Sequence, residues 1–153
     1  MNINQLLTPE ATFCSLKLSS KKKILEKVSE TLAQSIDCPV EDIFESLFTR
    51  EKLGSTALGH GIAIPHGRVK ACQKATAVFI LLDEPVDYDA PDNQPVDIIF
   101  AIMVPEQADN EQLRSLAEIA KILSDSTLVS QIRHAHCREA LIEILVKASE
   151  TIH

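Results

Sequence analysis

The sequence predicts one α/β domain spanning residues 1–153, in which a mixed β-sheet is flanked by helices on both faces. Two observations favour this class. Amphipathic helical patterns occupy both ends of the chain, whereas two continuous apolar stretches, 76–82 and 96–105, lie in its middle. Strands that are apolar throughout are typically covered on both faces, so the flanking helices are expected to form the outer layers.

The first part of the chain predicts two helices. Ser19 or Ser20 is suited to cap the first, whose apolar stripe comprises Ile24, Leu25, Val28 and Leu32. Residues 37–39 predict the start of the second helix, with Pro39 in the first turn, where its missing N–H is not needed. This helix is expected to end near Leu53 and Gly54. It is expected to bury Val40, Ile43, Phe44, Leu47 and Phe48.

The middle of the chain predicts strands and turns. All four glycines lie within residues 54–67, among short runs of strand type. Between the two apolar stretches, three prolines exclude a long regular element, namely Pro85, Pro91 and Pro95. Helical patterns return near Asn110, after Asp125 and near Cys137. The apolar face of the first of these helices comprises Leu113, Leu116, Ala117, Ala120 and Leu123.

Charge and composition exclude several classes of function. A net charge of −7 argues against a nucleic-acid-binding surface, which normally needs a basic patch. No apolar run approaches the roughly 20 residues that cross a bilayer, and the N-terminal residues lack the pattern of a signal peptide. The four cysteines are scattered without a CxxC pair, which indicates reduced thiols that mostly pack. We therefore expect a cytoplasmic protein with no nucleic-acid partner and no direct membrane insertion.

The segment GIAIPHGR places a histidine between a proline and a glycine. Ile62 and Ile64 share one face of a short strand, and Pro65 is expected to end that strand because it has no N–H to donate. Gly67 is expected to leave the imidazole uncrowded and to allow a sharp change of backbone direction. His66 would then lie at the end of a buried strand, where it suits a nucleophile or a ligand. A surface histidine without a role is the alternative.

An imidazole can transfer protons, bind a metal or become a phosphohistidine. A metal hydrolase would use His60, His66 and the histidines of 134–136, but no HExxH motif or Cys/His quartet is present. The chain also lacks the GxSxG of serine hydrolases and the glycine-rich loops that hold nucleotide phosphates. Metal binding is therefore the weaker hypothesis, and phosphoryl acceptance the stronger.

A phosphoryl-accepting histidine needs hydrogen-bond donors for the incoming oxygens. Arg50, Ser55, Thr56 and the backbone of Gly59 and Gly61 all lie just upstream and can supply them. Each also has an ordinary structural explanation, since an arginine can stabilise a helix C-terminus and hydroxyl groups can satisfy a turn.

The stretch REKLGSTALGHGIAIPHG resembles the active-site signature of the mannitol/fructose-type (type 2) enzyme IIA domains of the bacterial phosphotransferase system (PTS). That signature runs from an acidic or amide residue, through a hydrophobic–glycine pair, to a hydrophobic-Ala-hydrophobic-Pro-His-Gly ending. Glu51, the pair 58–59 and residues 62–67 match it here. The resemblance extends over nearly the whole chain. It is greatest to the nitrogen-regulatory branch of stand-alone proteins, called enzyme IIA-Ntr or PtsN.

The resemblance implies a single type 2 enzyme IIA domain over residues 1–153, with that family's α/β fold. It implies that His66 accepts a phosphoryl group, as a tele-phosphohistidine, from the phosphohistidine of an HPr-like carrier, without a metal, nucleotide or other cofactor. Arg50, Ser55 and Thr56 match positions that support the phosphate. Family members commonly carry a second histidine early in the helix after the last strand. Here that stretch has Gln112 and Arg114 instead, and either side chain could donate to a phosphate.

The function expected from these residues is that of a cytoplasmic phosphocarrier, a component of a nitrogen-regulatory phosphotransferase system, that regulates partner proteins through its phosphorylation state. The lack of an attached membrane or carrier domain favours regulation over sugar transport. One alternative is a sugar-specific enzyme IIA that passes phosphate to an enzyme IIB. Another is a binding module that is never phosphorylated.

Overall fold

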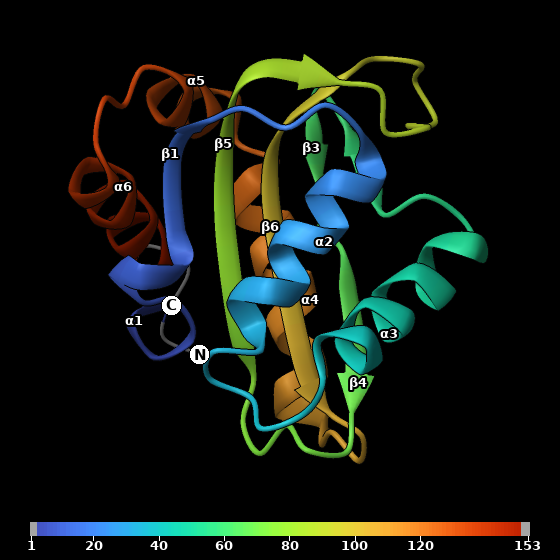
Figure 1. The fold of residues 1–153 in the computed structure, drawn as a ribbon. Coiled ribbons are helices and arrows are strands. Elements are labelled where there is room, and N and C mark those ends of the chain that lie inside the picture. The colour runs from blue at the N-terminus through green and yellow to red at the C-terminus, as the bar shows by residue number, and fades with distance from the viewer. Residues whose placement is uncertain (1–2, 151–153) are drawn as a thin grey trace.

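The computed structural model describes residues 3–150 and confirms the predicted fold class, a single α/β domain with a mixed sheet between helical layers (Figure 1). Within these residues the strands are β1 (Thr12–Leu16), β2 (Ala57–Gly59), β3 (Ile62–Ala63), β4 (His66–Val69), β5 (Thr76–Val86) and β6 (Val96–Pro105). The helices are α1 (Ile3–Leu6), the 3₁₀ turn η1 (Pro9–Ala11), α2 (Lys21–Leu32), α3 (Val40–Lys52), α4 (Asn110–Leu123), α5 (Ser126–Arg133) and α6 (Arg138–Glu150).

The central strand of the sheet is β6. On one side β5 pairs with it antiparallel, and β1 pairs parallel with β5. On the other side β3 and β4 pair in parallel with successive parts of β6, and β2 pairs antiparallel with β3. Two short strands therefore follow one another along the same edge of β6, and His66 is the first residue of the second.

Each face of the sheet has its own apolar core, because successive side chains of a strand point to opposite faces. Along β6, Phe100 and Ile102 join the core under α1, α4, α5 and α6, whereas Ile99 and Ala101 join the core under α2 and α3. Figure 1 shows α2 and α3 in front of the sheet and α4 behind it. The predicted double-sided burial of these strands is confirmed.

The helix predictions are confirmed with small corrections. Ser20 caps α2 by accepting a hydrogen bond from the backbone N–H of Lys23 at 3.1 Å. Pro39 is the N-cap of α3 and does not lie inside its first turn. Of the residues predicted to be buried here, Val40 and Phe44 are half-buried and Phe48 is 41% exposed, so the prediction was wrong for Phe48 and only partly right for the other two. Phe48 lies on the outer side of α3, where it stacks on Phe44 with ring centroids 5.7 Å apart.

The apolar face predicted for α4 is only partly formed. Leu123 is buried and Leu116 and Ala120 are half-buried, but Ala117 is exposed. The side chain of Leu113 lies outside the part of the chain that the structure describes.

Three strand predictions need correction. β5 continues past Leu82 through Pro85, because Val86 pairs with Val96 across the antiparallel ladder. β1, with the sequence TFCSL, was not predicted, because it is short and alternates too little to stand out. The third correction concerns His66, which begins the strand β4 after the break that follows β3.

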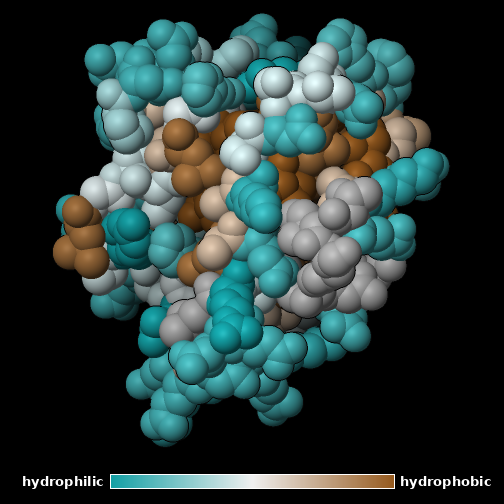
Figure 2. All heavy atoms as spheres, turned by 180° about the vertical axis from the view of Figure 1, so that it is seen from behind, coloured by the Kyte–Doolittle hydropathy of each residue, from teal (hydrophilic) through white to brown (hydrophobic). Residues whose placement is uncertain are grey.

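The cysteines, the lengths of the helices and the surface behind the sheet complete the description of the fold. All four cysteines are free thiols, and only Cys137 is exposed. Among residues 3–150 no helix is both long enough and apolar enough to cross a membrane. Figure 2 shows the face behind the sheet, where apolar side chains are visible toward the centre and polar ones surround them.

Candidate functional site

The backbone around Pro65 holds His66 in a defined orientation. β3 ends at Ala63, the N–H of Ile64 donates to the carbonyl of Thr56 at 3.0 Å, and the carbonyl of Pro65 accepts from the N–H of Ile102 at 3.0 Å. The short break between β3 and β4 therefore stays attached to the sheet on both sides. Pro65 interrupts the strand as predicted, but the chain returns to the edge of β6 at once.

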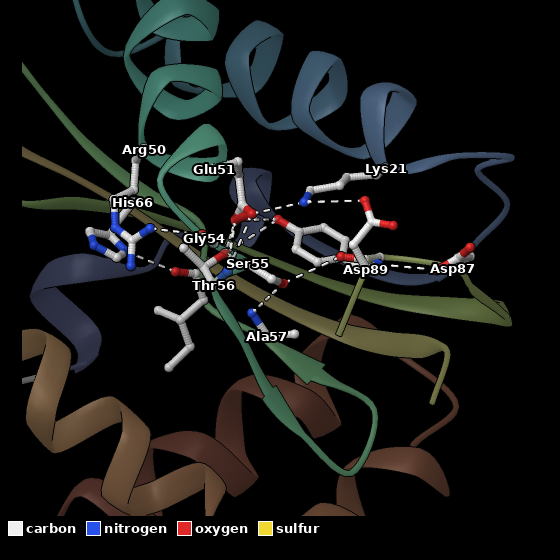
Figure 3. Close-up of polar contacts among 12 residues, drawn as sticks. Lys21, Arg50, Glu51, Gly54, Ser55, Thr56, Ala57, His66, Asp87 and Asp89 are labelled. Carbon is white, nitrogen blue, oxygen red and sulfur yellow. Dashed lines mark hydrogen bonds and ion pairs between the residues drawn. The ribbon is translucent and has the colours of Figure 1, made fainter. Parts of the chain in front are cut away.

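The tautomer of His66 follows from one hydrogen bond. Its Nδ1 lies 2.9 Å from the carbonyl oxygen of Ile64 (Figure 3). A carbonyl can only accept, so Nδ1 carries the hydrogen in this arrangement and Nε2 keeps a free lone pair. The imidazole is half-buried, so it is fixed in orientation while part of it remains accessible.

The surroundings of His66 favour the neutral imidazole. Burial is the largest cause of a pKa below the usual value for histidine, and the positive charges of Arg50 and Arg68 lower the pKa further. The hydrogen bond to Ile64 and the negative charge of Glu51 act in the opposite direction. The net effect lowers the pKa, so Nε2 is unprotonated and nucleophilic at neutral pH.

Arg50 is in the last turn of α3, where its guanidinium donates to the carbonyl oxygen of Gly54 at 2.8 Å. Figure 3 shows its side chain extending toward the His66 imidazole. The structure thus brings together the predicted acceptor and one predicted phosphate-supporting residue. The prediction that Arg50 stabilises a helix C-terminus also holds, since Gly54 lies just beyond the helix.

A buried polar cluster lies beneath the segment that follows α3. The carboxylate of Glu51, whose side chain is 3% exposed, accepts from the N–H and the hydroxyl of Thr56 and from the hydroxyl of Tyr88 at 3.1 Å. It also pairs with Lys21 Nζ at 3.0 Å, and that ammonium lies 4.6 Å above the Tyr88 ring. Burial and the Glu51 charge raise the pKa of Tyr88, which keeps its hydroxyl a donor.

This cluster uses the two hydroxyls that were predicted to support phosphate. The Thr56 hydroxyl donates to Glu51, and the Ser55 hydroxyl donates to the carbonyl of Tyr88 at 3.3 Å and accepts from the N–H of Ala57 at 3.1 Å. Both side chains therefore shape the loop, as Figure 3 shows, and their contact with a phosphate stays a prediction.

Gln112 and Arg114 lie in the first two turns of α4. The Gln112 side chain accepts from the N–H of Asp109, while the Asp109 side chain accepts from the N–H of Gln112, so the pair forms a capping box. Arg114 is exposed. The contacts of Gln112 explain it as a structural residue, and the prediction that either side chain supports a phosphate stays untested.

The histidines proposed for a metal site have other contacts. The backbone N–H of His60 donates to the Asp92 carboxylate at 2.9 Å, and His134 Nδ1 contacts the carbonyl of Ser130 at 2.7 Å. In the part of the chain that the structure describes, no three His, Cys, Asp or Glu side chains are placed to hold a metal ion. The structure therefore adds no support to the metal alternative.

Sequence reasoning missed several residues around the site. Arg68, two residues after His66 on β4, affects the imidazole charge, and its spacing along a strand could have indicated this. Lys21 and Tyr88 are distant in sequence from Glu51, and no local pattern connects them. One part of the prediction for Gly67 was wrong. It lies within a regular strand, so the sharp change of backbone direction predicted there does not occur, and an added Cβ would meet Ser46 Oγ at 2.4 Å.

Comparisons with known proteins point to one family. Residues 5–148 match the family model described as "Phosphoenolpyruvate-dependent sugar phosphotransferase system, EIIA 2". The chain is 39% identical over 152 residues to a nitrogen regulatory protein of Escherichia coli (strain K12), covering 99% of this chain and 93% of that protein.

Solved structures show the same fold. The crystal structure of nitrogen regulatory protein IIA-Ntr from Neisseria meningitidis matches with a TM-score of 0.90 and 38% identity, over 94% of this chain and 98% of that one. Enzyme IIA of the mannitol system, solved in complex with phosphorylated enzyme IIB from Escherichia coli, matches with a TM-score of 0.77 and 23% identity, over 92% and 97%. The second likeness concerns the fold alone.

Proposed function

We propose that this chain, which belongs to the type 2 enzyme IIA family of the phosphoenolpyruvate-dependent sugar phosphotransferase system, accepts a phosphoryl group on Nε2 of His66 from the phosphohistidine of an HPr-like carrier. The observation that carries the proposal is the hydrogen bond between His66 Nδ1 and the Ile64 carbonyl, because it leaves the Nε2 lone pair free. The lowered pKa of the imidazole keeps that lone pair unprotonated.

The proposed step exchanges one P–N bond for another. The bond between phosphorus and the carrier histidine breaks as the bond to Nε2 of His66 forms, and the electron pair of the broken bond stays on the carrier nitrogen. His66 keeps its Nδ1 hydrogen, and the Ile64 carbonyl stabilises the positive charge that develops on the ring. Positioning and charge stabilisation supply most of the catalysis in phosphoryl transfer, and the positive charge of Arg50, which already acts on the imidazole, would stabilise the phosphoryl oxygens.

The phosphorylated form would differ from the free form mainly in charge. A phosphoryl group adds roughly −1.5 to −2 charges, and here it would join an imidazole on which the charges of Arg50 and Arg68 both act, in a chain whose net charge is −7. Partner proteins that contact this face would distinguish the two forms by electrostatics. The likeness to nitrogen regulatory proteins supports a regulatory phosphocarrier of the cytoplasm.

Intact mass spectrometry tests the proposal. The protein is incubated with phosphoenolpyruvate, enzyme I and an HPr-type carrier that together phosphorylate a known enzyme IIA. We expect the wild type and a His60→Ala control to gain one acid-labile phosphoryl group, and His66→Ala to gain none. An unmodified wild type, or a phosphorylated His66→Ala variant, would overturn the proposal.

A further inference from the structure

One hydroxyl group of α3 makes two hydrogen bonds to the backbone of β4. Ser46 Oγ accepts from the N–H of Arg68 at 2.9 Å and donates to the carbonyl of the same residue at 2.9 Å. β4 pairs with β6 along its other edge, so this serine takes the place of a neighbouring strand at Arg68. Figure 1 shows α3 beside β4.

Gly67 makes this close approach possible. A Cβ at Gly67 would lie 2.4 Å from Ser46 Oγ and 3.2 Å from Ser46 Cβ. Real Cβ atoms do not approach other atoms so closely, so any larger residue here would push α3 away from β4. The glycine and the serine therefore form a matched pair across the helix–strand contact.

The same contact bears on how Arg50 lies relative to His66. Arg50 is four residues after Ser46, on the same face of α3 and about 6 Å further along the helix axis. His66 is two residues before Arg68, on the same face of β4 and about 6.6 Å back along the strand. The two spacings nearly agree. Because Gly67 faces Ser46, the His66 side chain points to the other face of β4, and the Arg50 side chain extends toward it from the last turn of α3 (Figure 3). Fixing Ser46 on Arg68 therefore fixes the point from which Arg50 reaches the imidazole.

We propose that Ser46 is a positioning residue, whose hydroxyl fixes the register of α3 along β4 and thereby holds the Arg50 guanidinium beside the His66 imidazole. Apolar packing of Ile43 and Leu47 holds α3 on the sheet, but such packing is not directional. A slip of one residue along α3 would turn Arg50 by about 100° around the helix axis, away from His66. The paired hydrogen bonds of Ser46 exclude that slip.

A double-mutant cycle tests this positioning without any phosphoryl donor. The pKa of His66 is measured by NMR titration of its ring protons. Arg50→Gln removes a positive charge and is expected to raise that pKa. In a Ser46→Ala background the same change should raise it by less than half as much, because Arg50 is no longer held in place. An equal rise in both backgrounds would overturn the proposal.

Ser29→Ala is the matched control. Ser29 is also a helix serine that bonds a backbone carbonyl, at 2.7 Å, but its bond is to Leu25 within α2. The effect of Arg50→Gln on the His66 pKa should be unchanged in this background. A loss equal to that in Ser46→Ala would show a general effect of stability and contradict a specific role for Ser46.

Gly67→Ala supplies a second cycle from the strand side. With Ser46 present, the added methyl group meets Oγ, whereas in Ser46→Ala the nearest atom is Cβ at 3.2 Å. We therefore expect Gly67→Ala to change the His66 pKa more in the wild type than in Ser46→Ala. Equal changes in the two backgrounds would contradict the proposed pair.

The consequence for phosphoryl transfer rests on the proposed function. In single-turnover transfer from the phosphorylated carrier, Ser46→Ala is expected to slow the step about tenfold at saturating carrier, since small misplacements of catalytic groups have effects of this order or larger. If the NMR cycle succeeds and the rate is unchanged, Ser46 positions Arg50 but Arg50 does not assist the transfer. Failure of the positioning proposal, seen in the NMR cycle, is therefore distinguishable from failure of the proposed role of Arg50 in transfer, seen in the rate.

Discussion

The buried carboxylate of Glu51 allows a quantitative prediction for Glu51→Ala. This change removes the acceptor of the Thr56 N–H, of the Thr56 hydroxyl and of the Tyr88 hydroxyl, and it leaves Lys21 without its partner at 3.0 Å. Tyr88 is fully buried and Thr56 is 6% exposed, so water cannot replace the lost acceptor freely. Each buried donor left without a partner costs about 1–3 kcal/mol.

The hydroxyl groups of Thr56 and Tyr88 can partly replace the lost acceptor by bonding to each other, because Thr56 Oγ1 and Tyr88 Oη lie 3.5 Å apart. We therefore expect Glu51→Ala to lower the free energy of unfolding by about 3–5 kcal/mol, within the range for breaking a buried ion pair. For a domain of this size that corresponds to a fall in Tm of roughly 6–20 °C.

Urea denaturation followed by circular dichroism measures this loss directly. Glu45→Ala is the control, since Glu45 is an exposed carboxylate of the same helix and should change stability by about 0.5 kcal/mol at most. Glu51→Gln should lose less than Glu51→Ala, because its amide oxygen still accepts. A loss below about 1 kcal/mol for Glu51→Ala would refute the view that this carboxylate organises the loop next to His66.

Three further predictions follow from the site and its surroundings. Folding lowers the pKa of His66, so the unfolded chain binds the proton more tightly than the folded protein. The free energy of unfolding should therefore rise with pH up to about 6.5, the usual pKa of histidine, as urea denaturation at several pH values can measure. The single-turnover rate of transfer to His66 should fall only below that pH. Gly61→Ala should lower the free energy of unfolding by about 1–3 kcal/mol. The φ angle of Gly61 is +82°, and a Cβ there would lie 2.5 Å from the Arg133 nitrogen that forms an ion pair with Asp97. An unchanged midpoint of urea denaturation would contradict this. Phe100→Ala should cost about 3–5 kcal/mol by the same assay, since Phe100 is fully buried, whereas a loss under 1 kcal/mol would mean that the core collapses around it.

The strongest sequence signals predicted the structure well. The long apolar runs became β5 and β6, and the caps at Ser20 and Asp125 mark helix starts as expected. β1 escaped prediction because five residues with mixed polarity give no clear period, although pairing with β5 stabilises them. Local sequence patterns therefore did not predict the element whose formation depends on pairing with a distant strand.

The same contrast holds at the site. His66 and Arg50 could be found in the sequence because proline, glycine and charge mark them locally. The contacts of Ser46 with Arg68 and of Lys21 with Glu51 join residues more than twenty positions apart. Such pairs become visible only when α2, α3 and β4 are placed together. For the same reason the Ser55 and Thr56 hydroxyls, predicted to support phosphate, were found in the polar cluster around Glu51 and Tyr88.

The most direct test of the central claim is to identify which nitrogen of His66 carries the phosphoryl group. The protein is labelled with ¹⁵N in its histidines, phosphorylated by the carrier system and studied by NMR at neutral pH. The hydrogen bond from Nδ1 to the Ile64 carbonyl predicts phosphorylation at Nε2 alone, with the Nδ1 hydrogen retained. A phosphoryl group on Nδ1, or on any residue other than His66, would contradict the account.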